Sequence, residues 1–216
     1  MHIESPKERL EKAVYKASRL AQKQASLSVL KCIYLEAKEN TLIIRGTNLE
    51  LGIEIRIPVK VIVEGAVALS GDVLTQFLSS VSSERVELIQ KEGVLEVKTD
   101  HTSASVKLES HEDFPIIPRV ASENGVKIPV ENFVDLVKSV SYSAALSGIR
   151  PELTCVYLYQ EGNALIAVST DSFRLSEKKY IPKEPISFDD ALIPAKNAGD
   201  ICRLLDGISG DITIYN

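Results

Sequence analysis

The chain repeats itself once with a long period, and this duplication constrains its fold more than any single motif does. Matching segments stand 123 residues apart: 32–36 and 155–159, 40–43 and 163–166, 47–48 and 170–171, and Pro6 and Pro129. A period this long is typical of a duplicated domain, because solenoid repeats recur every 20–50 residues or so. We therefore predict two domains of the same fold.

The repeat also sets the expected domain boundaries. Residues 1–118 form domain 1, the polar and aperiodic stretch 119–126 is the linker, and residues 127–216 form domain 2. A hydrophobic content of 44% supplies normal cores for both domains. By comparison with domain 1, about 30 residues of strand are missing from the end of domain 2.

Hydrophobic spacing predicts two helices and several short strands in each domain. Ser5 and Glu8 fit a capping box at the start of the first helix, with Pro6 in its first turn, and the helix runs to about Gln22. Domain 1 then reads as two similar halves, each a helix followed by strands. The further expected elements are strands 32–37, 41–47, 51–57 and 61–69, helix 71–81, and strands 85–90, 93–99 and 103–109. In domain 2 they are a helix from residue 129, strands 153–160, 164–170 and 173–181, helix 195–205 and strand 211–215.

The first helix carries a line of positive charge roughly opposite its apolar face. Its cations stand at helical spacing: Arg9, Lys12, Lys16, Arg19 and Lys23. The line is either a solvated surface, with Glu8 and Lys12 as an i,i+4 pair, or a face for the phosphates of a nucleic acid. No interleaving of aromatic and basic residues for base stacking is visible. The other helices add few cations, namely Lys138, Lys196 and Arg203, and the net charge is −5.

A second candidate site is the corner near residues 170–175, where one expected strand ends and the next begins. Asp171 and Arg174 are either a catalytic pair or a turn cap with an ion pair, and the turn is the reading we favour. Phe173, if exposed there beside Leu153 and Leu175, helps to form a peptide-binding surface. Sequence motifs of enzymes, cofactor sites and metal sites are absent, and the three histidines stand far apart.

The three cysteines, Cys32, Cys155 and Cys202, are too few and too scattered for a disulfide framework. Their odd number suits a reducing cytoplasm, and we expect Cys32 and Cys155 to be small buried residues on equivalent strands. No apolar run reaches the roughly 18 residues of a membrane span, and the first residues do not have the pattern of a signal peptide.

Four short motifs, in order along the chain, then point to a family. Residues 26–30 are similar to its T-L-P-I-L segment, 46–51 to G-T-D-L-E, 113–115 to D-F-P, and 170–175 to T-D-G-H-R-L. Through these motifs the whole chain resembles the bacterial DNA polymerase III beta subunit, the replication sliding clamp.

The resemblance implies an α+β DNA clamp fold, with duplicated domains that each pack two helices on antiparallel sheets. In that family three such domains form a subunit, and two subunits close head to tail as a homodimeric ring around duplex DNA. Helices line the hole, so the implied DNA-facing residues are Arg9, Lys12, Lys16, Arg19, Lys23, Lys138, Lys196 and Arg203. Contact with phosphates is independent of sequence, as sliding requires. No catalytic residue, cofactor or metal is implied.

The resemblance also implies a hydrophobic cleft that takes short peptide motifs from the polymerase III alpha subunit, the clamp loader and repair proteins. By motif match this chain contributes Leu153, Thr170, Ser172, Phe173, Arg174 and Leu175.

The sequence departs from the family pattern at several positions. Ser172-Phe173 replaces Gly-His, Pro151-Glu152 replaces an aromatic pair, and Gln24 stands where an arginine is common. Three repeats would need about 369 residues, so we expect this chain to be a fragment that lacks the third domain, is monomeric, and cannot close on DNA.

The sequence leaves two alternatives to the clamp open. One is an enzyme that uses Asp171, Arg174 and a further carboxylate. The other is a stand-alone module with the clamp fold that binds nucleic acid or peptide without forming a ring.

Overall fold

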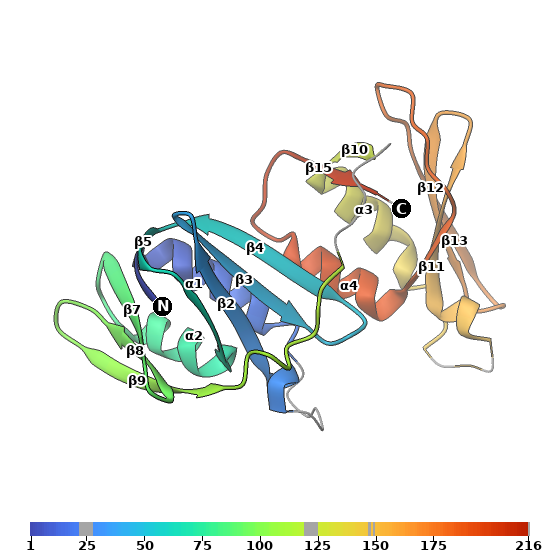
Figure 1. The fold of residues 1–216 in the computed structure, drawn as a ribbon. Coiled ribbons are helices and arrows are strands. Elements are labelled where there is room, and N and C mark those ends of the chain that lie inside the picture. The colour runs from blue at the N-terminus through green and yellow to red at the C-terminus, as the bar shows by residue number, and fades with distance from the viewer. Residues whose placement is uncertain (22–27, 119–124, 147, 149, 216) are drawn as a thin grey trace. The chain divides into compact units, whose positions relative to one another are not determined.

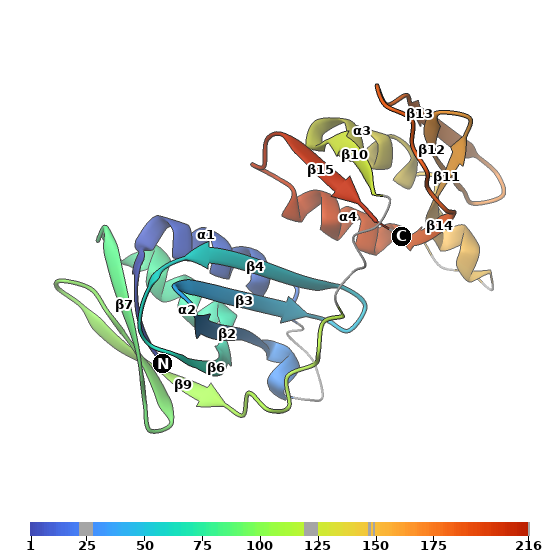
Figure 2. The same ribbon diagram turned by 45° about the horizontal axis from the view of Figure 1, so that its top comes forward.

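The computed structural model describes residues 1–21, 28–118, 125–146, 148 and 150–215. By its internal contacts the chain divides into two compact units, unit 1 from Met1 to Pro118 and unit 2 from Arg119 to Asn216. Most of the linker that we expected at 119–126 lies outside the described residues. Figures 1 and 2 show the chain in two views that differ by a turn of 45°, and each unit is described by itself.

Unit 1 builds one antiparallel sheet against two helices. Its elements are β1 (His2–Pro6), α1 (Lys7–Ser18), η1 (Ser28–Lys31), β2 (Cys32–Lys38), β3 (Thr41–Thr47), β4 (Gly52–Pro58), β5 (Lys60–Val63), β6 (Gly65–Ser70), α2 (Gly71–Ser80), β7 (Arg85–Lys91), β8 (Val94–Lys98) and β9 (Ser103–Glu109). The nine strands follow the order β4-β3-β2-β6-β9-β8-β7-β1-β5. Helices α1 and α2 pack against each other and lie side by side against the sheet (Figures 1 and 2).

Unit 2 repeats this plan with fewer strands. Its elements are β10 (Val126–Pro129), α3 (Val130–Ser141), η2 (Pro151–Thr154), β11 (Cys155–Glu161), β12 (Ala164–Thr170), β13 (Leu175–Tyr180), β14 (Ala191–Pro194), α4 (Ala195–Leu204) and β15 (Asp211–Ile214). Strands β13-β12-β11-β14 form one sheet and β10-β15 a second. Helices α3 and α4 pack together as α1 and α2 do.

The two units share strand register as well as order. β10 pairs with β15 in the way that β1 pairs with β7, with Pro129 opposite Asp211 where Pro6 stands opposite Arg85. The prediction that each helix of domain 1 is followed by its own strands is also met, since β2–β4 follow α1 and β7–β9 follow α2. The predicted α+β architecture of duplicated domains, each with two helices packed on antiparallel sheets, is therefore confirmed.

The predicted capping box at Ser5 is wrong. Residues 2–6 form β1, and Ser5 is buried and pairs with Val86 across the sheet. Its hydroxyl donates to the Pro6 carbonyl instead of capping α1. Pro6 has φ −59°, which suits both the end of the strand and the start of the helix. Sheet pairing therefore overrides the local capping signal.

Several other predictions of strands and helix ends need correction. The stretch 61–69 is two strands, because β5 pairs with β1 whereas β6 pairs with β2. The strand expected from residue 153 begins at Cys155, after the single turn of η2. The strand expected from Phe173 begins at Leu175, because residues 171–174 form a turn. The first helix ends at Ser18 rather than near residue 22, and β10 and β14 were not anticipated.

Each unit has its own core. The predicted apolar face of α1 is buried, with Leu10, Val14 and Ala17 fully inaccessible, and the face of α3 is buried in the same way. Cys32 and Cys202 are buried, but Cys155 is only partly so, and none of the three forms a disulfide bond. Among the described residues, no helix combines the length and the apolar character needed to cross a membrane.

Candidate functional site

The corner after β12 is held by its own side chains. The Asp171 carboxylate oxygen Oδ1 accepts from the backbone N–H groups of Phe173 and Arg174, at 3.0 and 2.9 Å. The Thr170 hydroxyl donates to the Arg174 carbonyl at 2.7 Å and accepts from the Ser172 N–H at 3.1 Å. Ser172 has φ +76°, in the left-handed region. A threonine and an Asx residue together therefore fix this turn.

The corner after β3 in unit 1 has the same bonds at the equivalent positions. Asn48 Oδ1 accepts from the N–H groups of Glu50 and Leu51, and the Thr47 hydroxyl bonds the Leu51 carbonyl and the Leu49 N–H. Leu49 has φ +71°. The duplicated backbone is thus preserved while the side chains at its tip differ.

The ion pair between Asp171 and Arg174 holds the turn together. Arg174 Nε donates to Asp171 Oδ2 at 3.0 Å, so both carboxylate oxygens of Asp171 are occupied. The backbone N–H groups of Arg174 and Phe173, together with the guanidinium, hold the pKa of Asp171 below its usual range. A carboxylate in this state is a poor general base. The geometry therefore favours the turn-cap reading over the catalytic one.

The tip of the corner exposes apolar side chains. Phe173 is 97% exposed, as the sequence suggested, and Leu175 is 65% exposed. Leu153 lies half-buried in η2, which packs beside β12. In unit 1 the equivalent tip carries Glu50 and Gly52 in place of Phe173 and Leu175. The corner of unit 1 exposes one apolar side chain, Leu49, whereas the corner of unit 2 exposes the larger pair Phe173 and Leu175.

Two apolar residues that the sequence reasoning missed lie after α3. Tyr142 is 63% exposed and Leu146 is fully exposed. The guanidinium carbon of Arg174 lies 5.9 Å from the centre of the Tyr142 ring, which places Tyr142 beside the corner. The sequence offered one sign of their exposure: neither side chain fits the apolar periodicity of the helix.

A chain of hydroxyl groups fixes Tyr142. The Ser176 hydroxyl donates to the Tyr142 oxygen at 2.7 Å and lies 2.7 Å from the hydroxyl of Ser143, which is fully buried. The hydrogen bonds from Ser176 and Ser143, with the nearby charge of Arg174, lower the pKa of the Tyr142 phenol. These contacts join the end of α3 to the start of β13 and give the corner a rigid support.

The cations of α1 lie on its solvent side. Arg9, Lys12 and Arg19 are exposed and Lys16 is half-buried, whereas Lys23 lies outside the described residues. Lys12 forms the predicted pair with Glu8, at 2.6 Å. Tyr15, which the sequence analysis did not single out, stands on the same exposed side.

In unit 2 the predicted cations are exposed on the α3–α4 pair. Burial raises the pKa of the Cys202 thiol, and the charges of Lys138 and Arg203 oppose that shift. Lys138 on α3 and Arg203 on α4 therefore both lie near this buried thiol. Lys196 is also exposed, and Arg203 is ion-paired with Asp200. In unit 1, α2 adds no cation to the pair α1–α2.

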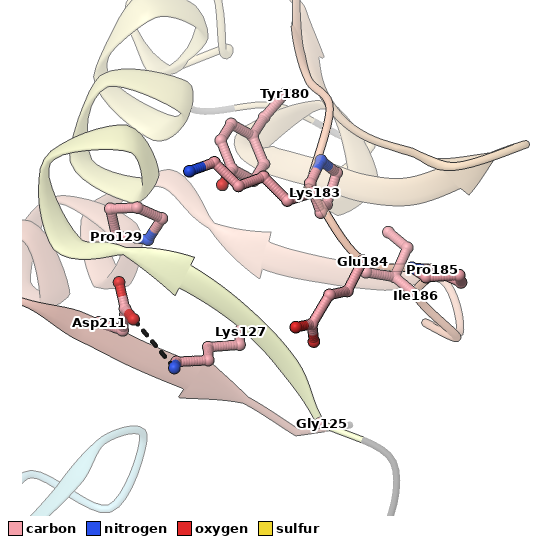
Figure 3. Close-up of a pocket in the computed structure, with 10 residues that line it drawn as sticks. Gly125, Lys127, Pro129, Tyr180, Lys183, Glu184, Pro185, Ile186 and Asp211 are labelled. Carbon is pink, nitrogen blue, oxygen red and sulfur yellow. Dashed lines mark ion pairs between the residues drawn. The ribbon is translucent and has the colours of Figure 1, made fainter.

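A pocket of about 260 Å³ in unit 2 contains none of the predicted site residues. It lies between β10 and residues 182–186, with the ion pair of Lys127 and Asp211 at its edge (Figure 3). In unit 1 the equivalent place is filled by β5, which pairs with β1. In unit 2 Pro182 and Pro185 lack N–H donors, and the Asn163 and Gln160 side chains hold this segment against the β11–β12 hairpin. The pocket therefore exists because residues 182–186 do not pair with β10 in the way that β5 pairs with β1.

The motif at residues 113–115 has a packing role. Phe114 contacts Val29 and Leu30 and lies 5.4 Å from the Tyr34 ring. Gln24 and residues 26–27 of the segment 26–30 lie outside the described residues. Within the described part of the chain no group of three His, Cys, Asp or Glu side chains is placed to hold a metal.

Comparison with known proteins agrees with this geometry. The family model for the N-terminal domain of the DNA polymerase III beta subunit matches residues 1–118, and the model for its central domain matches residues 127–215. The beta sliding clamps of Staphylococcus epidermidis and Staphylococcus aureus are 26% and 24% identical over 201 residues. These alignments cover 89% of this chain and 53% of the relatives, so the chain spans about half the length of the curated relatives it matches.

Solved structures show the same fold. The DNA polymerase sliding clamp of Bacillus subtilis aligns with a TM-score of 0.94 at 19% identity, over 100% of this chain and 60% of that one. A putative DNA polymerase III beta subunit from Eubacterium rectale also gives 0.94, at 21% identity and with the same coverage. With family models matched over nearly all of its length, the chain belongs to the DNA polymerase III beta subunit family.

Proposed function

We propose that the protein acts as a sliding clamp, a non-catalytic processivity factor of DNA replication. Its helices face duplex DNA inside a ring of two subunits, and its second unit tethers the replicative polymerase and other factors through short peptides. The duplicated corner carries this proposal: the same backbone turn exposes Phe173 and Leu175 in unit 2, where unit 1 has Glu50 and Gly52 and exposes Leu49 alone. We further propose the domain layout 1–118, 119–126 and 127–216, and a cytoplasmic location, which suits three cysteines that form no disulfide bond.

The peptide site is centred on Phe173, Leu175 and the half-buried Leu153. Two nearly unburied apolar side chains on a turn held by side-chain hydrogen bonds form a rigid apolar anchor surface, which is what short peptides recognise. Thr170 and Ser172 shape the turn, and Arg174 borders the surface while paired with Asp171. The presence of Phe173 where relatives of the family have histidine favours an aliphatic or aromatic side chain in the bound peptide.

The peptide site is tested by titrating a fluorescent peptide with the 216-residue chain. The probe is the clamp-binding segment of the polymerase III alpha subunit from the same organism. We expect Leu175→Ala and Phe173→Ala to weaken binding at least fivefold, about 1 kcal/mol, because each removes exposed area at the anchor. Ile181→Ala is the matched control, since Ile181 is 68% exposed just beyond the other end of β13.

Equal losses for all three variants, or no effect of any, would refute the assignment of the peptide site. Because the three side chains are exposed, none of the substitutions should change stability by more than about 0.5 kcal/mol. Loss of binding through unfolding is thus separated from loss of contact.

DNA binding is proposed for the helix faces of both units. On α1, Arg9 and Arg19 are exposed and make no ion pair within the described part of the chain, so their charges are available to phosphates. Lys138, Lys196 and Arg203 supply the corresponding charge on α3 and α4. Few, exposed cations give weak contacts that are independent of sequence, and this suits a protein that must slide.

Ring formation is tested with the protein at its natural length, which intact mass from the source cell establishes. A clamp loaded on nicked circular DNA should stay bound at high salt and be released when the circle is cut. Retention on linear DNA at high salt would contradict a topological mechanism. A natural length of 216 residues with simple salt-sensitive binding would favour the alternative, a clamp-fold module that works without a ring.

A further inference from the structure

Tyr15 and Arg19 form a closely associated pair on the exposed side of α1. The Arg19 nitrogen Nη1 donates to the Tyr15 hydroxyl oxygen at 2.8 Å. The guanidinium carbon also lies 5.5 Å from the centre of the Tyr15 ring, a cation–π distance. Tyr15 remains 47% exposed, so the pair stands at the surface rather than in the core.

This pairing differs from that of the neighbouring lysines. Lys12 is neutralised by Glu8 and Lys7 by Glu11, both across one helical turn. Arg19 contacts a neutral phenol and makes no ion pair within the described residues. Its charge is therefore held in one place without being cancelled.

The contacts leave both side chains able to bind an anion. A guanidinium has five N–H donors in a planar fork, and the Tyr15 hydroxyl takes only one of them. The phenol accepts in this bond, so its own O–H remains available as a donor. An arginine side chain that is already ordered loses less conformational entropy on binding, which strengthens its contact with a phosphate.

We propose that Tyr15 is a positioning residue of the DNA-facing surface: it holds the Arg19 guanidinium ready for a backbone phosphate of duplex DNA and adds a second donor. The inference rests on the proposed DNA contact of α1 and assigns it a particular pair of side chains. The pair recognises phosphate and not base edges, so it is independent of DNA sequence.

The test measures binding of the 216-residue chain to a linear duplex of about 30 base pairs, as the affinity and its dependence on salt. Removing a cation should flatten the slope of log K against log salt by about 0.9, whereas moving a cation should not change the slope. We therefore expect Arg19→Gln to lower both affinity and slope. Tyr15→Leu should lower affinity about two- to fivefold, the loss of one exposed cation–π contact, at an unchanged slope.

Two further variants make the outcome specific. Tyr15→Phe keeps the ring and loses the hydroxyl, so it should fall between the wild-type chain and Tyr15→Leu. Tyr34→Phe alters a tyrosine of the same unit that lies away from α1 and should leave affinity unchanged. NMR of the Arg19 Nε–H group should show greater motion in Tyr15→Leu, with the rest of α1 unaffected.

The possible failures separate the two proposals. If the wild-type chain has no salt-dependent affinity for the duplex, or if Arg19→Gln keeps the wild-type slope, the DNA-facing assignment of α1 itself is wrong. If Arg19→Gln flattens the slope while Tyr15→Leu binds like the wild-type chain, Arg19 binds without help and the positioning role of Tyr15 is refuted. A flattened slope in Tyr15→Leu would also refute it.

Discussion

Gly46 lies where the backbone of α1 comes close to the sheet of unit 1, and its replacement by alanine should be strongly destabilising. Gly46 is buried in β3, and a Cβ atom placed on it would lie well inside contact distance of the Ala17 carbonyl oxygen and 3.0 Å from the carbonyl carbon. Carbon atoms pack best at about 3.5–4.0 Å. Both obstructing atoms belong to the backbone of α1, so no side-chain rotation relieves the clash.

The size of the destabilisation depends on how far α1 or β3 can shift to make room for the added methyl group. Helix α1 is held by Leu10 and Val14, which are fully buried, and β3 is paired on both sides. Overpacking of a core costs about 1–3 kcal/mol, and we place Gly46→Ala at the upper end, about 3 kcal/mol, because the obstruction is backbone. In a domain of this size that lowers the melting temperature of unit 1 by roughly 10 °C.

The assay is native-state hydrogen exchange with urea denaturation, read separately in each unit. Gly199→Ala is the matched control, because Gly199 lies inside α4 with open space around it and should gain about 0.5–1 kcal/mol in unit 2. If Gly46→Ala costs less than about 1 kcal/mol, the helix and sheet do not touch through their backbones as described, and the reasoning fails.

Three further predictions concern single side chains. Leu10→Ala should destabilise unit 1 by about 2–5 kcal/mol in urea denaturation, because Leu10 is fully buried; a loss below 1 kcal/mol would contradict the assigned core. Ser172→Gly should stabilise unit 2 by about 0.5–1 kcal/mol, because glycine tolerates the left-handed backbone that costs serine energy. The pKa of Asp171 lies below its ordinary value of 3.8, so its stabilisation of the corner is present above that pH and is lost as pH falls through the lowered pKa. The amide signals of Phe173 and Arg174 should therefore shift together only below about pH 3.8 in NMR, and Asp171→Asn should abolish that shift.

Periodicity and self-similarity in the sequence predicted the two domains and most of their helices and strands, whereas the clamp fold was implied by the resemblance to a family. The spacing of Leu10, Val14 and Ala17 defined the buried face of α1, and the match of residues 47–48 with 170–171 located the two corners. These signals are local or are comparisons within the chain, so they need no knowledge of which strands meet.

The elements that were missed depend on contacts between distant residues. β1 has five residues and pairs with β7, which begins at Arg85, so nothing near residues 2–6 indicates the partner strand. The support of Tyr142 by Ser176 likewise joins residues 34 positions apart. The bond of Arg19 to Tyr15 spans only one helical turn, but the sequence does not indicate which neighbour an arginine will choose.

Duplication also explains how the second corner can acquire a binding surface at little cost to the fold. In both copies a threonine and an Asx residue satisfy the backbone of the turn, so its conformation does not depend on the residues at the tip. The tip side chains are exposed, and changes there scarcely affect stability. The change from Glu50 and Gly52 in one copy to Phe173 and Leu175 in the other therefore alters what the corner can bind while the turn beneath it stays the same. By the same reasoning, substitutions at Phe173 should change peptide preference without changing the stability of unit 2.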